Sequence, residues 1–129
     1  MNNISVLLKE AKSAASRAYA PYSKFKVGCA VLSSSGKIYS GCNVENISYP
    51  VGTCAEAGAL AAMINGGDNK IKEVLVYAES KHLISPCGAC RQRIAEFAEE
   101  DALVHMTDAT GEVKSMSIGD LLPMGFKEF

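Results

Sequence analysis

Three cysteines and one glutamate have the residue types and spacing of a metal site. Cys87 and Cys90 form a C-x-x-C pair, a spacing that lets two thiolates bind one metal ion from a single helical turn. Cys54 stands far upstream in a different predicted element, and Glu56 follows it two residues later. Four protein ligands close a structural zinc site, whereas three leave one position open. The set therefore predicts a catalytic zinc site with Cys54, Cys87 and Cys90 as ligands.

An open position on zinc gives a neighbouring carboxylate a chemical role. Zinc lowers the pKa of a bound water toward neutrality, and a carboxylate beside that water can carry protons. Glu56 stands in that place, so it is the candidate catalytic residue. A site of this kind suits hydrolytic deamination.

Two other interpretations of these cysteines are open. A C-x-x-C pair is also typical of redox-active dithiols, but that interpretation leaves Cys54 and Glu56 without a role. A structural zinc site needs a fourth ligand, for which His82 and His105 are candidates. His105, however, falls in a predicted strand that we place at the sheet edge. The catalytic zinc site accounts for more of the pattern.

Length and composition limit the classes of protein. The 129 residues predict a single domain, 1–129, and 48% hydrophobic residues are enough for a buried core. A formal net charge of −1 gives no electrostatic reason to expect nucleic acid or a membrane as a partner. No apolar run approaches the length of a membrane span, and charged residues spread through positions 1–20 exclude a signal peptide.

The cysteine content indicates a reducing compartment. Five cysteines are an odd number in a chain of ordinary composition, which argues against oxidised secretion and predicts a cytoplasmic protein. Cys29 and Cys42 lie in predicted strands, where we expect them to be small buried apolar residues.

Hydrophobic periodicity predicts alternating helices and strands. Helices are predicted at 4–19, about 54–64 and 87 to about 97, and strands at 25–31, 37–42, 71–78 and 102–107. Turns at 33–36 and 108–111 separate strands, and Ser117 is expected to cap a short helix that ends at Leu122-Pro123. The order α-β-β-α-β-α-β, with or without a short β-α tail, predicts an α/β fold: a three-layer α-β-α sandwich with a mixed sheet of about five strands.

Both groups of metal ligands fall where a predicted helix begins. Helix N-termini present free N–H groups and a partial positive charge. These features stabilise thiolates and lower their pKa, which zinc binding requires.

The metal-site residues and their surroundings resemble those of a known enzyme family. Cys54-Ala55-Glu56 followed by Pro86-Cys87-Gly88-Ala89-Cys90-Arg91-Gln92 is similar to the signature of the small cytidine deaminases of the homotetrameric three-cysteine type. Further similar segments, in the family's order, are 20–25, 41–46, 48–49 and 121–123. The resemblance implies a cytidine-deaminase-like fold, one Zn²⁺ per chain, a small-molecule cytosine nucleoside as substrate and a homotetramer.

The resemblance also implies a role for each matching position. Glu56 would take a proton from the water, protonate the pyrimidine N3 and pass a proton to the departing ammonia; in zinc deaminases this glutamate is not a ligand. The implied substrate-binding residues are Phe25 against the base, Asn43 and Glu45 on the ribose 3′-hydroxyl, the backbone of Ala55 and Ser85 on the base edge, and Tyr49 and Phe126 at a neighbouring subunit's site. Without the resemblance, we would interpret the aromatic residues Phe25, Tyr49 and Phe126 as ordinary packing residues. Asn43 and Glu45 would be interpreted as solvated loop residues.

One position departs from the pattern that the resemblance implies. Many members of that family carry arginine directly after the glutamate, where it bonds the ligand thiolates, whereas this chain has Ala57. The blasticidin S deaminases, another branch, also lack that arginine. Three thiolates exceed the charge of Zn²⁺ by one, so compensation is expected from the helix N-termini or from another cation. We name Arg91, next to Cys90, as the hypothesis for that cation.

The resemblance therefore implies zinc-dependent hydrolysis of cytidine and 2′-deoxycytidine to the uridine forms, with release of ammonia, as in pyrimidine salvage. Deamination of blasticidin S or another modified cytosine nucleoside is the alternative within the same class. A non-enzymatic zinc-binding module is the alternative from a different class, and Glu56 beside an open metal position argues against it.

Overall fold

A five-stranded mixed sheet organises residues 3–129, the part of the chain that the computed structural model describes. Its strands are β1 (Val27–Ser33), β2 (Ile38–Cys42), β3 (Ile71–Ala78), β4 (Ala98–Thr107) and β5 (Val113–Ser117), in the order β2-β1-β3-β4-β5. β1 pairs antiparallel with β2 and with β3, β3 pairs parallel with β4, and β5 returns antiparallel to β4.

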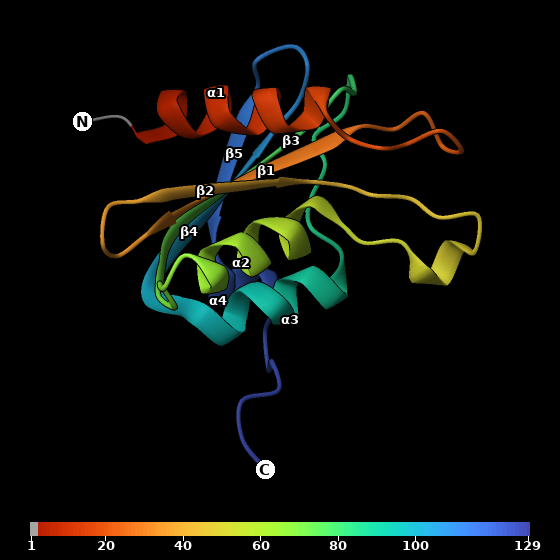
Figure 1. The fold of residues 1–129 in the computed structure, drawn as a ribbon. Coiled ribbons are helices and arrows are strands. Elements are labelled where there is room, and N and C mark those ends of the chain that lie inside the picture. The colour runs from red at the N-terminus through yellow and green to blue at the C-terminus, as the bar shows by residue number, and fades with distance from the viewer. Residues whose placement is uncertain (1–2) are drawn as a thin grey trace.

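Helices cover both faces of this sheet, as Figure 1 shows. α1 (Asn3–Ser16) lies on one face, and α2 (Ala55–Asn65), α3 (Gly88–Phe97) and the short α4 (Ile118–Leu121) lie on the other. A 3-10 helix, η1 (Tyr49–Val51), interrupts the loop before α2. The predicted three-layer α-β-α sandwich is therefore confirmed. Within residues 3–129, no helix is both long enough and apolar enough to cross a bilayer.

The alternation of side chains along the strands builds two cores. Successive residues of a strand point to opposite faces of the sheet. On β3, Val74 and Val76 pack with the helices α2, α3 and α4, whereas Leu75 and Tyr77 pack with α1. The central strand is thus buried on both faces, which accounts for its continuous apolar run.

Two glycines let a helix on each face approach the sheet closely. A Cβ atom at Gly28 of β1 would lie 1.9 Å from the Ala11 carbonyl oxygen of α1. A Cβ atom at Gly41 of β2 would lie 2.3 Å from the Ala59 amide nitrogen of α2. The backbone of α2 therefore rests directly on β2, which fixes the place where α2 begins.

Four sequence predictions differ from the structure, apart from shifts of one residue. The strand predicted at 102–107 begins at Ala98, because Ala98 already pairs with Ile71 before an irregularity in the register of β3 and β4. The first helix ends at Ser16 rather than 19, because Tyr19 leaves the helix to form a β-bridge with Val44. The first strand begins at Val27 rather than 25, because the Val27 amide donates to the Asn43 side chain. The predicted edge position of His105 is wrong, since β5, only optional in the predicted order, pairs with β4 on that side.

The two remaining cysteines differ in burial. Cys29 on β1 is fully buried, as predicted, whereas Cys42 at the end of β2 is only partly buried.

Candidate active site

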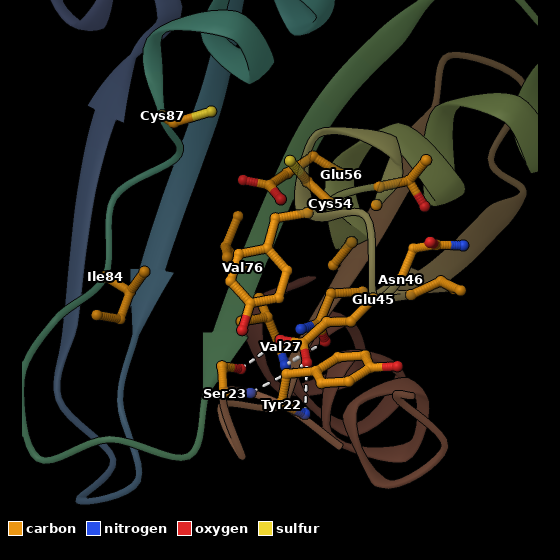
Figure 2. A pocket seen from close by; sticks show the side chains of 16 residues that line it. Tyr22, Ser23, Val27, Glu45, Asn46, Cys54, Glu56, Val76, Ile84 and Cys87 are labelled. Carbon is orange, nitrogen blue, oxygen red and sulfur yellow. Dashed lines mark hydrogen bonds between the residues drawn. The ribbon is translucent and has the colours of Figure 1, made fainter. Parts of the chain in front are cut away.

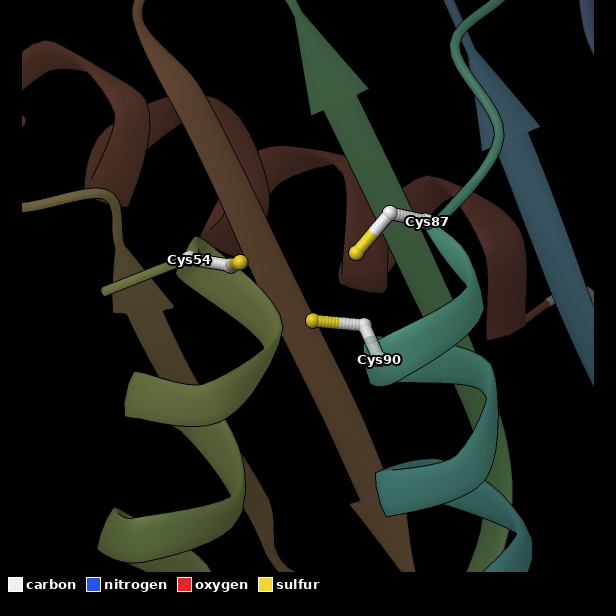
Figure 3. A group of neighbouring side chains, drawn as sticks. All are labelled: Cys54, Cys87 and Cys90. Carbon is white, nitrogen blue, oxygen red and sulfur yellow. The ribbon is translucent and has the colours of Figure 1, made fainter. Parts of the chain in front are cut away.

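The sulfur atoms of Cys54, Cys87 and Cys90 converge between the first turns of α2 and α3 (Figure 3). Their Sγ atoms lie within 4.8 Å of one another, and all three are free thiols. Zinc–thiolate bonds of about 2.3 Å in tetrahedral geometry place sulfurs roughly 3.8 Å apart. The cluster therefore fits one Zn²⁺ held by three thiolates, with one coordination position open.

Helix geometry brings the two parts of the cluster to the same point. Cys54 is the N-cap of α2 and Cys87 is the N-cap of α3, while Cys90 lies in the first turn of α3. The nearby backbone amide of Cys90 lowers the pKa of the Cys87 thiol, as expected at a helix N-terminus. This effect favours the thiolate form that a metal ion binds.

Burial disfavours the ionised form of the other two thiols. Burial raises the pKa of the Cys54 thiol, and it raises the pKa of the fully buried Cys90 thiol further, with the Glu56 charge adding to the increase at Cys90. Thiolates at these positions need a nearby positive charge, which a divalent metal ion supplies.

A cavity of about 580 Å³ opens beside the cysteine cluster. Cys54, Cys87 and Glu56 line one end, and Tyr22 and Ser23 line the other, as Figure 2 shows. Apolar side chains such as Val27, Val76 and Ile84 form part of the walls between them. This volume is within the range of pockets that enclose small organic ligands.

Glu56 has the surroundings of a proton carrier. It is the second residue of α2, its side chain is 5% exposed, and it lines the cavity together with the two cysteines. Burial raises the pKa of its carboxyl group, partly offset by its own backbone amide and by the Arg93 charge. A carboxyl with a raised pKa is better suited to exchange protons near neutral pH.

The far end of the cavity is built by Asn43 and Glu45. The Asn43 side chain accepts from the Val27 amide at 2.9 Å and donates to the Phe25 carbonyl at 2.8 Å. Glu45 Oε1 accepts from the amides of Tyr22 and Ser23 at 3.0 and 3.1 Å. The Ser23 hydroxyl also donates to Glu45, and these hydrogen bonds lower the pKa of the Glu45 carboxyl. Each side chain keeps hydrogen-bonding capacity for a ligand.

The family model described as "Cytidine and deoxycytidylate deaminase zinc-binding region" matches residues 1–106. The chain belongs to this deaminase family. Among its curated relatives is the cytidine deaminase of Sporosarcina psychrophila, 40% identical over 98% of this chain and 93% of the relative. The cytidine deaminase of Mycoplasma genitalium is 39% identical over 98% of this chain and 97% of its own length.

Solved deaminase structures share the fold as well. The 1.6 Å crystal structure of cytidine deaminase from Burkholderia pseudomallei superposes with a TM-score of 0.91, at 42% identity, covering 98% of this chain and all of that one. Cytidine deaminase from Mycobacterium tuberculosis gives a TM-score of 0.87 at 33% identity, covering 99% of this chain and all of that one. The similarity therefore extends over the whole domain and not only over the zinc-binding motif.

Not all the candidate substrate-binding residues of this deaminase line the cavity of a single chain. Ala55 and Tyr49 line it, in addition to Asn43 and Glu45. The cavity lining does not include Phe25, Ser85 or Phe126. Phe25 is half-buried, Ser85 is exposed next to the lining residue Ile84, and Phe126 lies in the C-terminal tail that projects away from the sheet in Figure 1.

The structure contradicts the hypothesis that Arg91 turns toward the thiolates. Its guanidinium instead donates to the Pro86 carbonyl at 2.7 Å, the Leu121 carbonyl at 2.8 Å and the Ser85 hydroxyl at 3.1 Å. Arg91 thus ties the segment before α3 to the end of α4. The guanidinium that meets a ligand sulfur belongs to Arg93, whose Nη1 lies 3.5 Å from Cys90 Sγ. The i,i+3 spacing of Cys90 and Arg93 on a helix was the signal that could have indicated it.

Tyr22 and Ser23 are lining residues to which the sequence assigned no separate role. Both lie in the segment 20–25 that resembles the family, so the resemblance indicates that this segment belongs near the site. Their hydrogen bonds to Glu45 are seen only in the structure.

Proposed function

We propose that this protein is a zinc-dependent deaminase that hydrolyses the C4 amino group of cytidine and 2′-deoxycytidine and releases ammonia. The observation that carries the proposal is the buried carboxylate of Glu56 in the same cavity wall as two thiols of the three-cysteine cluster. The cytidine deaminases among its relatives support the choice of substrate.

Cys54, Cys87 and Cys90 would hold the metal ion, which when bound supplies Lewis-acid activation of water. Glu56 accepts one proton from that water while the water oxygen attacks C4 of the ring. Glu56 then delivers this proton to N3 of the ring. The remaining proton on that oxygen then passes through Glu56 to the leaving amino group, so that ammonia departs and C4 becomes a carbonyl. The apolar walls exclude bulk water from these transfers.

The opposite end of the cavity suits the sugar of the nucleoside. Glu45 remains ionised because its pKa is lowered, and one acceptor site of its carboxylate is free of protein donors. Asn43 retains one N–H donor after its bond to the Phe25 carbonyl. Together they can bind a ribose 3′-hydroxyl. The backbone of Ala55, which lines the cavity, would read the base edge together with that of Ser85, and Phe25 would pack against the base; Ser85 and Phe25 lie outside the cavity lining of the single chain. Because a 3′-hydroxyl is common to cytidine and 2′-deoxycytidine, we expect both to be substrates.

We further propose that the active protein is a homotetramer in which Tyr49 and Phe126 reach a neighbouring subunit's site. The exposed fractions of these side chains, 73% for Tyr49 and 70% for Phe126, support an additional partner surface. The unpaired thiols support a reducing cytoplasm, where the reaction would serve pyrimidine salvage.

Ammonia release from a substrate panel tests the proposal. The panel is cytidine, 2′-deoxycytidine, free cytosine and blasticidin S, each incubated with the zinc-loaded protein. We expect release from the two nucleosides and little from free cytosine, which lacks the sugar that Asn43 and Glu45 bind. Activity confined to blasticidin S would indicate the alternative substrate, and no release from any compound would favour a non-enzymatic zinc module.

Removal of one ligand tests the metal site separately. A Cys87→Ala variant should lose stoichiometric zinc in metal analysis, because two thiolates cannot hold the ion as three do. One zinc per chain in that variant would contradict the assignment of Cys87 as a ligand.

A further inference from the structure

The proposed metal centre carries an excess of negative charge. Three thiolates exceed the charge of a zinc ion by one, and the Glu56 carboxylate lies in the same cavity wall. A second cation close to the sulfurs would stabilise the loaded centre, because Coulomb interactions are strong in a partly buried site.

Arg93 is placed to be that cation. Its Nη1 lies 3.5 Å from the sulfur of Cys90, a distance at which an N–H group donates to sulfur. Both residues are on α3, three positions apart, so their side chains lie on the same side of the helix. Cys90 is fully buried whereas Arg93 is exposed, so the guanidinium approaches the sulfur from the solvent side of the helix pair and not through the substrate cavity.

The approach is through a groove between α2 and α3. The groove has a volume of about 440 Å³, and both Ala57 and Arg93 line it. Ala57 follows Cys54 by three residues, the same spacing that separates Arg93 from Cys90. Because the side chain of Ala57 is only a methyl group, the groove has room for the side chain of Arg93. A long side chain at position 57 would enter the same groove.

Arg93 and Arg91 differ in their partners. The Arg93 guanidinium meets the sulfur of Cys90. Arg91, by contrast, is engaged with carbonyl and hydroxyl oxygens.

We propose that Arg93 is a positioning residue of the zinc centre, whose guanidinium offsets the excess negative charge of the three thiolates from a groove that Ala57 leaves open. This inference rests on the proposed zinc site, and it assigns to α3 the cation that the residue after Glu56 does not supply in this chain.

Zinc affinity, measured by competition with a chromophoric chelator, tests the proposal without any turnover. Arg93→Ala should bind zinc about 10- to 100-fold more weakly than the parent, the usual cost of removing a group that supports a metal ligand. Arg93→Lys keeps the charge and should retain more affinity than Arg93→Ala. Arg17→Ala is the matched control, because Arg17 lies beyond the end of α1 and donates to Ser13; it should bind zinc like the parent.

Relocating the cation separates charge from packing. Ala57→Arg in the Arg93→Ala background returns a guanidinium to the same groove and should restore at least part of the lost affinity. In the Co²⁺-substituted protein, the thiolate-to-cobalt charge-transfer bands should shift in Arg93→Ala and return in the double variant, because a hydrogen bond to sulfur makes the sulfur a weaker electron donor.

Two results would overturn the proposal. The first is an unchanged zinc affinity in Arg93→Ala. The second is a loss that neither Arg93→Lys nor Ala57→Arg reverses, which would assign the effect to packing. Neither of these two results depends on turnover. If the protein binds one zinc but releases no ammonia, the proposed function fails, and the zinc-affinity measurement still tests the role of Arg93.

Discussion

Glu56 shows how a single residue acquires a function from where its helix begins. It follows the N-cap Cys54 by two positions, so the first turn of α2 carries both a metal ligand and a carboxylate. The same turn is buried against the sheet, which leaves Glu56 5% exposed and raises the pKa of its carboxyl. One short stretch of sequence therefore places the Glu56 carboxyl close to the metal ligand Cys54 and also raises the proton affinity of that carboxyl, as the proposed chemistry needs.

A Glu56→Gln variant should keep its zinc and its fold but lose about 10²–10⁴-fold in kcat, the usual contribution of general acid–base catalysis. Glutamine has nearly the same shape but cannot exchange protons. Ammonia release and metal content are measured on the same preparation. A loss of less than about tenfold, with zinc retained, would mean that another residue carries the protons.

At the scale of elements, close contact between α2 and β2 positions the metal ligand. The Cβ atom that alanine would add at Gly41 comes within 2.3–2.7 Å of backbone atoms of Ala59, Gly58 and Ala55. Backbone atoms cannot rotate away as a side chain can, so α2 would have to move. Any such movement displaces Cys54 and Glu56 relative to α3.

Gly41→Ala should therefore destabilise the fold by about 1–3 kcal/mol, the usual cost of overpacking. It should also weaken zinc binding, because α2 carries one ligand and α3 the other two. Gly119→Ala in α4 is the matched control: its added methyl has only the Ser117 hydroxyl within 4 Å, at 3.9 Å. Urea unfolding of both variants checks this, and equal stabilities would contradict it.

A polar network joins four elements on the α1 side of the sheet. His105 on β4 bonds Glu73 on β3 at 2.7 Å and the Ser115 hydroxyl on β5 at 2.6 Å, and Asn3 of α1 donates to Glu73 at 2.6 Å. His105 is 3% exposed. Its contacts with Glu73 and Ser115 explain its burial, and the structure places it away from the cysteine cluster, so it is not a fourth metal ligand.

This network predicts a pH-dependent contribution to stability. Burial acts to raise the pKa of Glu73, but the hydrogen bonds from His105 and Asn3 outweigh it and leave that pKa below its ordinary value. A carboxyl with a lowered pKa stabilises the fold above its unfolded-state pKa, about 4.3, and loses that contribution as pH falls through its folded-state value.

Glu73→Gln should therefore cost about 1–3 kcal/mol of unfolding free energy at pH 7 and progressively less in acid. Urea unfolding at neutral pH and near pH 3 measures the difference. Glu10→Gln, at an exposed position of α1, is the control and should be close to neutral throughout. A cost for Glu73→Gln that stays constant between the two pH values would contradict the prediction.

For the whole molecule, exposed apolar side chains lie where a second chain could cover them. Phe126 stacks on Phe129 at 6.2 Å in the C-terminal tail, and Gln92 of α3 holds the Phe126 backbone through two hydrogen bonds. Tyr49, beside the cavity, contacts Tyr22 at 5.9 Å and remains largely exposed. These aromatic groups are exposed in one chain, which supports the proposal that they reach a neighbouring subunit's site.

Light scattering should therefore give four times the chain mass of 13.7 kDa at assay concentration. Phe126→Ala should weaken that assembly or raise the KM for cytidine, because the residue would contribute to an adjacent subunit. A fully active monomer would contradict both the tetramer and the proposed role of Phe126.

Local sequence determined the metal ligands and the elements that carry them. Cys87 and Cys90 are a single turn apart, Glu56 follows Cys54 by two residues, and both groups stand at helix starts, so short-range spacing was enough to predict them. The strand β3 was predicted at its observed bounds because a continuous apolar run marks a strand buried on both faces.

Only the tertiary structure decided which distant groups meet. That Cys54 reaches the thiols of α3, that β5 covers the edge beside His105, and that Arg93 rather than Arg91 reaches Cys90 all depend on how segments pack. Arg91 follows Cys90 directly and Arg93 follows it by three residues, but the helix turns the nearer arginine toward carbonyl oxygens and the more distant one toward the sulfur. Spacing along the sequence gives the side of a helix that a residue occupies, whereas its partner there is set by the neighbouring elements.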